Sequence, residues 1–231
     1  MNSSINILHI ETATQVCSCA LSNNGKLVFN RESHTAQSHA TLLGVFVEEA
    51  IKFSRENNIK IHAVAVSSGP GSYTGLRIGV SEAKGLAYGL DAKLIAIPTL
   101  TLLAWTIRDK VDKDTLLVPM IDARRMEVYT SIYDTSLKII EPTEAKIIGE
   151  ESFKDIMLNH KVAFFGDGAL KCKETIDHPN AIFITDVHPL ASNMLELSKQ
   201  AYAEGCFEDV AYFEPFYLKD FVATKPKNKV F

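Results

Sequence analysis

The feature of this 231-residue chain that most restricts its fold is a run of glycines, because six of its twelve lie between Gly69 and Gly89. An apolar stretch over residues 62–67 precedes them, and apolar positions with helical spacing follow over residues 75–89. Glycine permits positive φ and close backbone approach, so the pattern predicts a buried strand, a tight turn and a helix. A strand that turns directly into a helix is typical of α/β folds.

Small residues recur at every fourth position of this predicted helix, at Gly75, Gly79, Ala83 and Ala87. They form one smooth ridge along the helix. Because glycine inside a helix costs ~1 kcal/mol relative to alanine, the ridge predicts another backbone lying close to it. That backbone belongs either to a neighbouring element of the same lobe or to a second chain.

A second predicted helix, over residues 38–57, spreads its apolar side chains over about half of its circumference, more than the ~100° stripe that packing on one sheet requires. The excess favours contact with a second chain, although a deeply buried helix gives the same pattern. We therefore predict that the two helices form a paired surface for a partner. The predicted interface residues are Leu42, Leu43, Phe46, Val47, Ala50, Gly75, Arg77, Gly79, Ala83 and Ala87.

The glycine-rich turn itself is a candidate phosphate site, because the start of a helix presents backbone N–H groups and a positive dipole end. The turn matches neither the P-loop nor the dinucleotide-binding pattern, so a purely structural turn is the competing interpretation. The candidate nucleotide-binding residues are Thr12, Gly69, Gly71, Ser72, Tyr73 and Thr74. We predict no catalytic residue and no metal ligand.

The order of predicted elements indicates a duplicated fold. Strands are predicted over 5–11, 15–22, 26–32, 62–67 and 93–97, with an Asn24-Gly25 hairpin turn, and helices over 38–57, 75–89 and 100–109, the last with Thr99 as its N-cap. Strands over 115–121, 126–133, 137–148 and 162–165, with helices over 152–158 and 191–203, repeat this order weakly. The prediction is an actin-like (ASKHA, ribonuclease H-like) β-β-β-α-β-α fold with a reduced second lobe, divided into 1–109, 110–218 and a tail, 219–231.

Composition and charge limit the classes of function. The net charge of −4 argues against autonomous nucleic-acid binding, which usually needs a basic surface. The four cysteines lack metal-site spacing and are predicted to be buried apolar residues of a cytoplasmic protein. The first residues lack a basic signal-peptide region, and no apolar run is long enough to span a membrane.

Two further polar sites have structural and functional interpretations. His39 precedes the long helix and is more simply a polar residue at a helix start than a ligand. The stretch 122–125 lies between two predicted strands and is either an ion-paired turn or part of a binding site.

Three segments together resemble one known family: ILHIETATQVCSCAL from Ile7 onward in the first strands, GPGSYTGLRIGVSEAKGLA from Gly69, and IDARRMEVY from Ile121. They resemble the TsaB (YeaZ) family over residues 5–133, with a weaker match at 214–221. The resemblance implies an accessory subunit in threonylcarbamoyladenosine modification of tRNA. It implies an actin-like fold and a heterodimer, through the two helices above, with the catalytic homologue TsaD.

The resemblance further implies that the ATPase TsaE joins the complex and that tRNA is reached only through the complex. We expect the chain to hold no cofactor of its own, and whether ATP or ADP binds at the subunit junction is left open by the sequence. The partner then transfers the threonylcarbamoyl group to N6 of adenosine 37 in tRNAs that read codons beginning with A. In this chain Glu11 is followed by Thr12 and Ala13 without glycine, which removes the close phosphate approach of an active actin-like loop. We therefore expect a subunit without catalytic activity.

Two alternatives remain open at this stage. One is an ATP-binding enzyme of the same superfold, kinase-like or glycoprotease-like, for which Gly166-Asp167-Gly168 is the sole sign of an adenosine loop. The other is a homodimer that uses the glycine ridge on a second copy of itself. Neither the stoichiometry nor the residues that approach tRNA can be read from the sequence.

Overall fold

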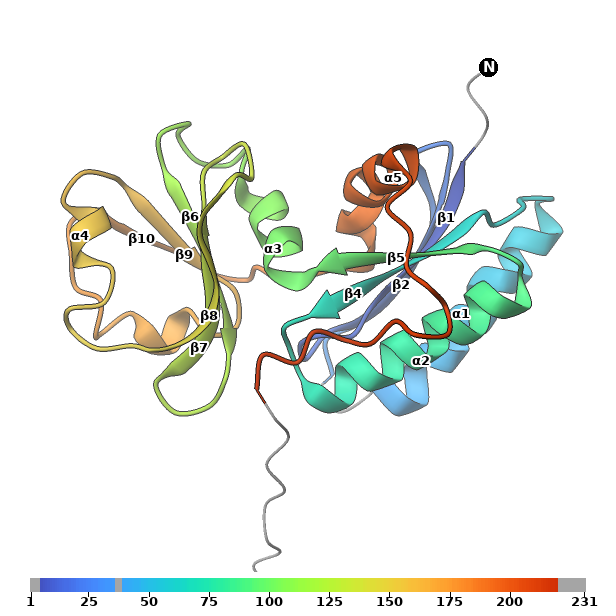
Figure 1. Ribbon diagram of the computed structural model, residues 1–231, viewed down its shortest axis with the longest axis horizontal. Coiled ribbons are helices and arrows are strands. Elements are labelled where there is room, and N and C mark those ends of the chain that lie inside the picture. The colour runs from blue at the N-terminus through green and yellow to red at the C-terminus, as the bar shows by residue number, and fades with distance from the viewer. Residues whose placement is uncertain (1–4, 36–38, 220–231) are drawn as a thin grey trace, which may run out of the picture.

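The computed structural model describes residues 5–35 and 39–219. The chain forms two α/β lobes side by side (Figure 1), each built on one five-stranded sheet. In the described residues, no helix combines the length and the apolar character needed to cross a bilayer.

The sheet of the first lobe has the order β3-β2-β1-β4-β5, with β1, β2 and β3 antiparallel and with β4 and β5 parallel to β1. The hairpin predicted at Asn24-Gly25 is confirmed, since both residues adopt positive φ (54° and 74°). The first lobe contains β1 (Asn6–Glu11), β2 (Cys17–Asn23), β3 (Lys26–Ser33), α1 (His39–Glu56), β4 (Ala63–Gly69), α2 (Tyr73–Gly89) and β5 (Lys93–Pro98).

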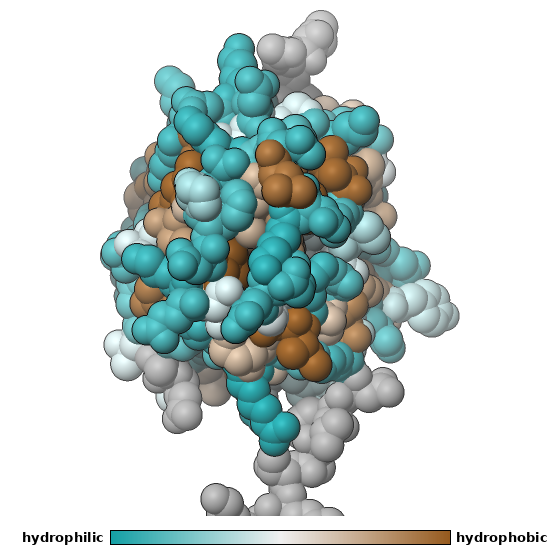
Figure 2. Space-filling view, turned by 90° about the vertical axis from the view of Figure 1, so that its left-hand side faces the viewer, coloured by the Kyte–Doolittle hydropathy of each residue, from teal (hydrophilic) through white to brown (hydrophobic). Residues whose placement is uncertain are grey.

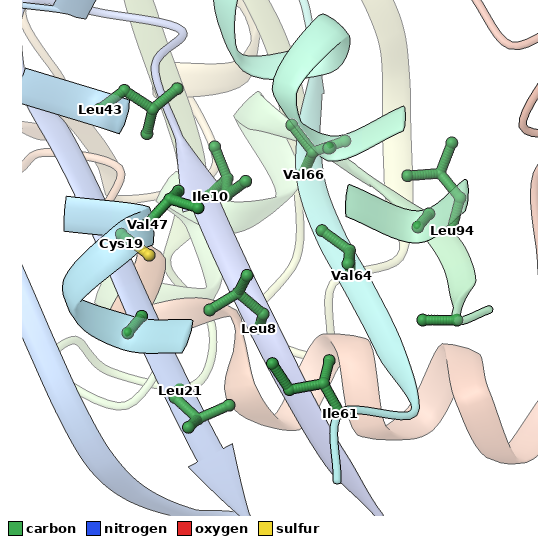
Figure 3. Packing of buried hydrophobic residues seen from close by; sticks show 14 of the residues in the cluster. Leu8, Ile10, Cys19, Leu21, Leu43, Val47, Ile61, Val64, Val66 and Leu94 are labelled. Carbon is green, nitrogen blue, oxygen red and sulfur yellow. The ribbon is translucent and has the colours of Figure 1, made fainter. Parts of the chain in front are cut away.

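Helices α1 and α2 cover one face of this sheet, and a C-terminal helix, α5 (Leu195–Glu204), covers the other (Figure 1). Alternate residues of β1 supply the two cores: Leu8 and Ile10 pack towards α1 and α2, and Ile7 packs towards α5. Figure 3 shows Leu43 and Val47 of α1 directed at the strands beneath.

The second lobe has the same topology, with the strand order β10-β9-β6-β7-β8. Read from the other edge as β8-β7-β6-β9-β10, it matches β3-β2-β1-β4-β5 of the first lobe strand by strand. Its antiparallel and parallel pairings are also the same. The second lobe contains β6 (Leu116–Asp122), β7 (Glu127–Tyr133), β8 (Ile139–Ile147), α4 (Lys154–Met157), β9 (Val162–Phe165), the 3-10 turn η1 (Leu170–Cys172) and β10 (Ala181–Ile184). The predicted duplicated actin-like α/β fold is confirmed.

The reduction of the second lobe falls on its helices. The place of the 18-residue α1 is taken by the four residues of α4, and the place of the 17-residue α2 by the three residues of η1. The helix predicted over 152–158 is therefore shorter than expected, and β10 was not predicted because its four residues are mostly half-exposed.

The helix between the lobes, α3 (Thr99–Ile107), begins one residue earlier than predicted. Thr99 is the first helical residue rather than the N-cap. Pro98 holds the N-cap position without a side-chain hydrogen bond. Leu100, Leu103 and Ile107 of α3 pack into the core of the second lobe.

The second lobe was predicted to extend to residue 218. This is wrong, because the chain returns to the first lobe from residue 191 onward. A 3-10 turn, η2 (Ala191–Met194), docks on the first sheet, where the Ala191 N–H donates to Ser18 Oγ at 2.9 Å. Met194 and Leu197 complete the core beneath β1, β4 and β5. Three cysteines are buried as predicted, whereas Cys206 is exposed.

Candidate functional site

The ridge of small residues on α2 faces the chain's own core, which corrects the prediction that it meets a partner. Gly75, Gly79, Ala83 and Ala87 are all buried. A Cβ added at Gly75 would overlap the carbonyl oxygen of Thr12, and one at Gly79 would overlap its hydroxyl oxygen. The close neighbour of both glycines is therefore Thr12, at the start of the turn between β1 and β2, through its backbone at Gly75 and through its side chain at Gly79.

The inner residues of α1 are also occupied within the first lobe. Leu43, Val47 and Ala50 are buried in the same core as the ridge. Of the predicted interface residues, Leu42 and Phe46 are half-buried and Arg77 is exposed. The close backbone that the ridge predicted is present at Gly75 and belongs to the same lobe, one of the two alternatives left open, whereas the close neighbour of Gly79 is the Thr12 side chain.

The β1–β2 turn is clamped by the start of α2. Thr12 Oγ1 donates to the carbonyl of Gly75 at 2.8 Å, and the Ser72 N–H donates to the carbonyl of Ala13 at 2.7 Å. A Cβ at Gly71 would overlap that same carbonyl and lie 2.9 Å from the Ala13 Cβ. Glycine at this position is what permits the contact.

Contacts within the chain occupy Thr12 and Gly69 and crowd Gly71, three residues of the predicted nucleotide site. Thr12 is fully buried with its hydroxyl bonded to α2, Gly71 presses on the turn, and a Cβ at Gly69 would lie 2.6 Å from the carbonyl oxygen of Phe216. Gly71, Ser72, Tyr73 and Thr74 line a cavity, whereas Thr12 and Gly69 do not. The Ser72 hydroxyl accepts from the Gly75 N–H at 3.2 Å and caps α2.

The second lobe builds the equivalent contact after β9. Gly166 has a φ of +99°, close to the +107° of Gly69. A Cβ at Gly168 would lie 2.9 Å from the backbone nitrogen of Asp122, at the start of the β6–β7 turn. Each lobe therefore presses a Gly-x-Gly loop onto its own first hairpin turn, and the Gly166-Asp167-Gly168 motif is explained structurally.

A cavity of about 880 Å³ lies between these two clamped turns. The β6–β7 turn contributes Asp122 and Arg124, and β9 is followed by Asp167. Its lining residues are Ala13, Thr14, Gln15, His39, Ala40, Gly71, Ser72, Tyr73, Thr74, Gly75, Ile78, Ile121, Asp122, Ala123, Arg124, Tyr129, Asp167, Phe216, Tyr217, Leu218 and Lys219.

Acidic and basic groups are balanced around the β6–β7 turn. Asp122 pairs with Lys171 at 2.5 Å and accepts from the Arg124 N–H at 2.8 Å. Asp167 accepts from the Asp122 N–H at 3.0 Å, and burial raises the pKa of the Asp167 carboxyl. The ion-paired turn predicted over 122–125 is therefore present, and its Arg124 also lines the cavity.

Glu11 closes the end of β1 as a fully buried acid. One carboxylate oxygen accepts from the Ala13 N–H at 2.6 Å, and the other has no hydrogen-bond partner among the described residues. Burial raises the pKa of Glu11 from 4.5 to about 7. Because Glu11 is absent from the cavity lining, it acts on the turn beside it rather than on a ligand in the cavity.

His39 is the first residue of α1 and is buried, with Nε2 3.2 Å from the carbonyl oxygen of Val16. This contact agrees with the structural role predicted for it. Across the described part of the chain, no three His, Cys, Asp or Glu side chains converge as a metal site would require.

The outer sides of α1 and α2 carry features that the sequence interpretation missed. Gly44 and Gly85 are exposed, and a Cβ at either would meet nothing within 4 Å. Val45 is 46% exposed and Tyr88 is 84% exposed. On the second lobe, Figure 2 shows a face whose apolar side chains form separate patches among polar ones.

Comparison with known proteins places the chain in a family. The family model for TsaD, tRNA N6-adenosine threonylcarbamoyltransferase, matches residues 32–227. The tRNA threonylcarbamoyladenosine biosynthesis protein TsaB of Escherichia coli (strain K12) is 32% identical over 226 residues, covering 95% of this chain and 96% of the relative. The TsaB of Haemophilus influenzae (strain ATCC 51907 / DSM 11121 / KW20 / Rd) is 26% identical, with 96% of each chain covered.

Solved structures agree with the fold. YeaZ from Pseudomonas aeruginosa superposes with a TM-score of 0.77 at 24% identity, covering 93% of this chain and 100% of that one. A protein described as similar to peptidase YEAZ, from the same organism, gives 0.78 at 24% identity, covering 94% and 100%. The resemblance noted in the sequence is confirmed: the chain belongs to the TsaB (YeaZ) family, within the wider group that the TsaD family model describes.

Proposed function

We propose that this chain takes part in threonylcarbamoyladenosine biosynthesis on tRNA as a subunit that docks onto a TsaD-type catalytic partner. The observation that supports the pathway is the 32% identity to the E. coli TsaB over 95% of the chain. In this proposal the partner transfers the threonylcarbamoyl group to N6 of adenosine 37, TsaE supplies ATPase activity, and tRNA contacts the complex. The chain itself contributes a surface and not a reacting group.

The proposed surface is the solvent side of α1 and α2. The buried glycines of α2 are needed by the lobe itself, but Gly44 and Gly85 are not, since nothing lies within 4 Å of an added Cβ. Each glycine inside a helix costs ~1 kcal/mol relative to alanine. A partner backbone that lies against both helices accounts for this cost.

The two open glycines fit one surface. In α2, the half-buried Ile78, Glu82 and Leu86 recur at every fourth position, on the flank opposite to Lys84, which contacts the C-terminal segment. That flank lies towards α1, because Ile78 and Ala40 of α1 line the same cavity. Gly85 borders this flank and Gly44 lies one turn after Ala40.

The chemistry of the surface suits a protein partner. Exposed Val45 follows Gly44 in α1, and exposed Tyr88 lies one turn after Gly85 in α2, so both supply area beside the glycines. Arg77 is an exposed cation on the Lys84 flank of α2, where its guanidinium donates to the Tyr73 hydroxyl at 3.2 Å. Tyrosine and arginine are enriched in the parts of interfaces that contribute most to affinity. The residues proposed for docking are Gly44, Val45, Gly85 and Tyr88 around the junction of the two helices, with Leu42, Phe46 and Arg77 on their outer flanks.

Leucine substitutions at the open glycines test the docking surface. Gly44→Leu and Gly85→Leu should leave the fold intact, because each site is open, and should weaken binding to purified TsaD at least tenfold in a titration. Gly149→Leu, at an open glycine of the second lobe, is the matched control and should bind normally. Normal binding by both helix variants would refute the surface.

A second experiment tests the pathway separately. Cells depleted of this chain should lose threonylcarbamoyladenosine from their tRNA, and re-expression should restore it. Unchanged tRNA would refute the role in biosynthesis, whatever the binding result. Light scattering of the chain alone identifies a homodimer on the same surface, which Gly85→Leu should then dissociate.

ATP or ADP at the subunit junction is part of this proposal. The cavity beside the start of α2 supports it, since Ser72 and Thr74 line that cavity with Arg124 opposite. Isothermal titration of ATP into the isolated chain and into the complex tests it. Binding that requires the complex supports a junction site, whereas no heat in either sample refutes it.

A further inference from the structure

The C-terminal segment, residues 206–219, runs along the first lobe and ends between the two lobes (Figure 1). Hydrogen bonds fix it to β5, β4 and α2. The Glu208 N–H donates to the carbonyl of Leu94 at 2.9 Å, and the Phe216 N–H donates to the carbonyl of Ser68 at 2.7 Å. The segment is therefore attached at both of its ends to the first lobe.

Side chains of α2 strengthen this attachment. Lys84 Nζ donates to the carbonyls of Ala211 and Phe213 at 3.1 and 2.9 Å. The ring of Tyr217 packs on that of Tyr73, with centroids 4.8 Å apart. These contacts bind the segment to the helix that borders the cavity.

The backbone of the first lobe is itself adapted to the segment. Gly69 has a φ of +107°, which other residues rarely adopt, and a Cβ there would lie 2.6 Å from the carbonyl oxygen of Phe216. Glycine at 69 therefore lets the segment lie against the end of β4. The end of β4 and the C-terminal segment therefore form a specific, close-packed contact.

The polar contact of the segment with the second lobe is weaker than its contacts with the first lobe. Lys219 Nζ lies 2.5 Å from both carboxylate oxygens of Glu127, on β7. The Lys219 side chain is 45% exposed and that of Glu127 is 19% exposed. Ion pairs with such access to water are weak and sensitive to salt.

We propose that residues 206–219 form a latch over the interlobe cavity, fixed to the first lobe and releasable from the second at the Lys219–Glu127 ion pair. Phe216, Tyr217, Leu218 and Lys219 form one wall of the cavity. The lobes are also joined covalently at α3 and at residues 185–190, so release of the latch opens the cavity without separating the lobes. This device is independent of the partner proposed above.

Thiol labelling of the cavity tests the latch. Ala123 lines the cavity and is half-buried, and Cys206 is the exposed cysteine among the described residues. An Ala123→Cys, Cys206→Ser chain therefore reports access to the cavity through its rate of reaction with a thiol reagent. Adding Lys219→Ala should raise this rate about two- to fivefold, the range expected for loss of an exposed ion pair.

The control is Lys199→Ala, which removes a lysine paired with Glu196 inside the first lobe and should leave the rate unchanged. Salt at 1 M should raise the rate of the parent chain but not that of Lys219→Ala. The charge exchange Lys219→Glu with Glu127→Lys should restore the parent rate. A rate unaffected by Lys219→Ala, or raised equally by Lys199→Ala, would overturn the latch, and a failed charge exchange would overturn its release point.

Discussion

Alanine substitutions along α2 distinguish the glycines that this chain needs from those that it leaves open. Gly79 and Gly85 lie in the same helix and gain the same helix propensity, ~1 kcal/mol, when alanine replaces them. Gly85→Ala meets no atom within 4 Å, so it should stabilise the protein by about that amount. Gly79→Ala should destabilise it, because the new Cβ overlaps Thr12 Oγ1 and lies 3.3 Å from the Thr12 Cβ.

The cost at Gly79 has two parts. Forcing a methyl group into a packed site costs ~1–3 kcal/mol. Displacing the Thr12 hydroxyl breaks its 2.8 Å hydrogen bond to Gly75 and leaves buried groups unpaired, which costs another ~1–3 kcal/mol. After the propensity gain is subtracted, the net destabilisation is ~1–5 kcal/mol, or a fall in Tm of at least ~2 °C in a chain of this size.

Urea and thermal denaturation of the two variants measure this difference. Thr12→Ala should rescue Gly79→Ala in part, because it removes the overlapping atom. The same rescue should fail for Gly75→Ala, whose Cβ overlaps the Thr12 backbone carbonyl. If Gly79→Ala stabilised the protein as Gly85→Ala does, the close approach of α2 to the β1–β2 turn would be refuted.

Three further predictions concern the buried groups. The raised pKa of Glu11 favours its protonated form in the folded state, so the free energy of unfolding should fall by ~3 kcal/mol as pH rises from 4.5 to about 7. Glu11→Gln should abolish this fall in urea titrations. The same dependence of unfolding free energy on pH in both proteins would contradict the prediction. Phe164→Ala, which removes a fully buried ring packed on Phe153 and Phe183, should cost ~3–5 kcal/mol by thermal denaturation, and a cost below 1 kcal/mol would contradict the second core. Ser18→Ala leaves the buried Ala191 N–H unpaired and should cost ~1–3 kcal/mol with faster amide exchange in η2, whereas unchanged exchange would contradict the docking of η2.

Most of the fold could be predicted from local patterns. Periodicity located the long helices and nearly every strand because their buried faces repeat, as Leu43 and Val47 do in α1. It missed β10, whose four residues are partly exposed, and overestimated α4. The return of residues 191–204 to the first lobe could not be predicted, because it depends on contacts with Ile7 and Ser18 that are distant in sequence.

The site was harder to predict because spacing cannot say which neighbour fills a groove. Gly79 and Gly85 look alike in the sequence, yet one faces Thr12 and the other faces open space. The spacing of apolar residues in the sequence could have distinguished them. Gly75 and Gly79 share a helix face with Leu76 and Val80, and the structure buries that face in the core. Gly85 lies outside this apolar face of α2, and Gly44 lies outside the face of α1 that carries Leu43 and Val47. Their positions therefore indicate that both glycines face outward.

The paired glycine loops have a consequence for how the cavity walls are ordered. In many ligand sites a mobile loop is fixed by the ligand itself. Here Gly71 and Gly168 allow each lobe to hold its own hairpin turn through contacts within the lobe. The turns are therefore ordered without a bound ligand. The two turns should therefore keep their conformation in the empty cavity, and adjustment to a bound ligand should come from the angle between the lobes or from the C-terminal latch rather than from these turns.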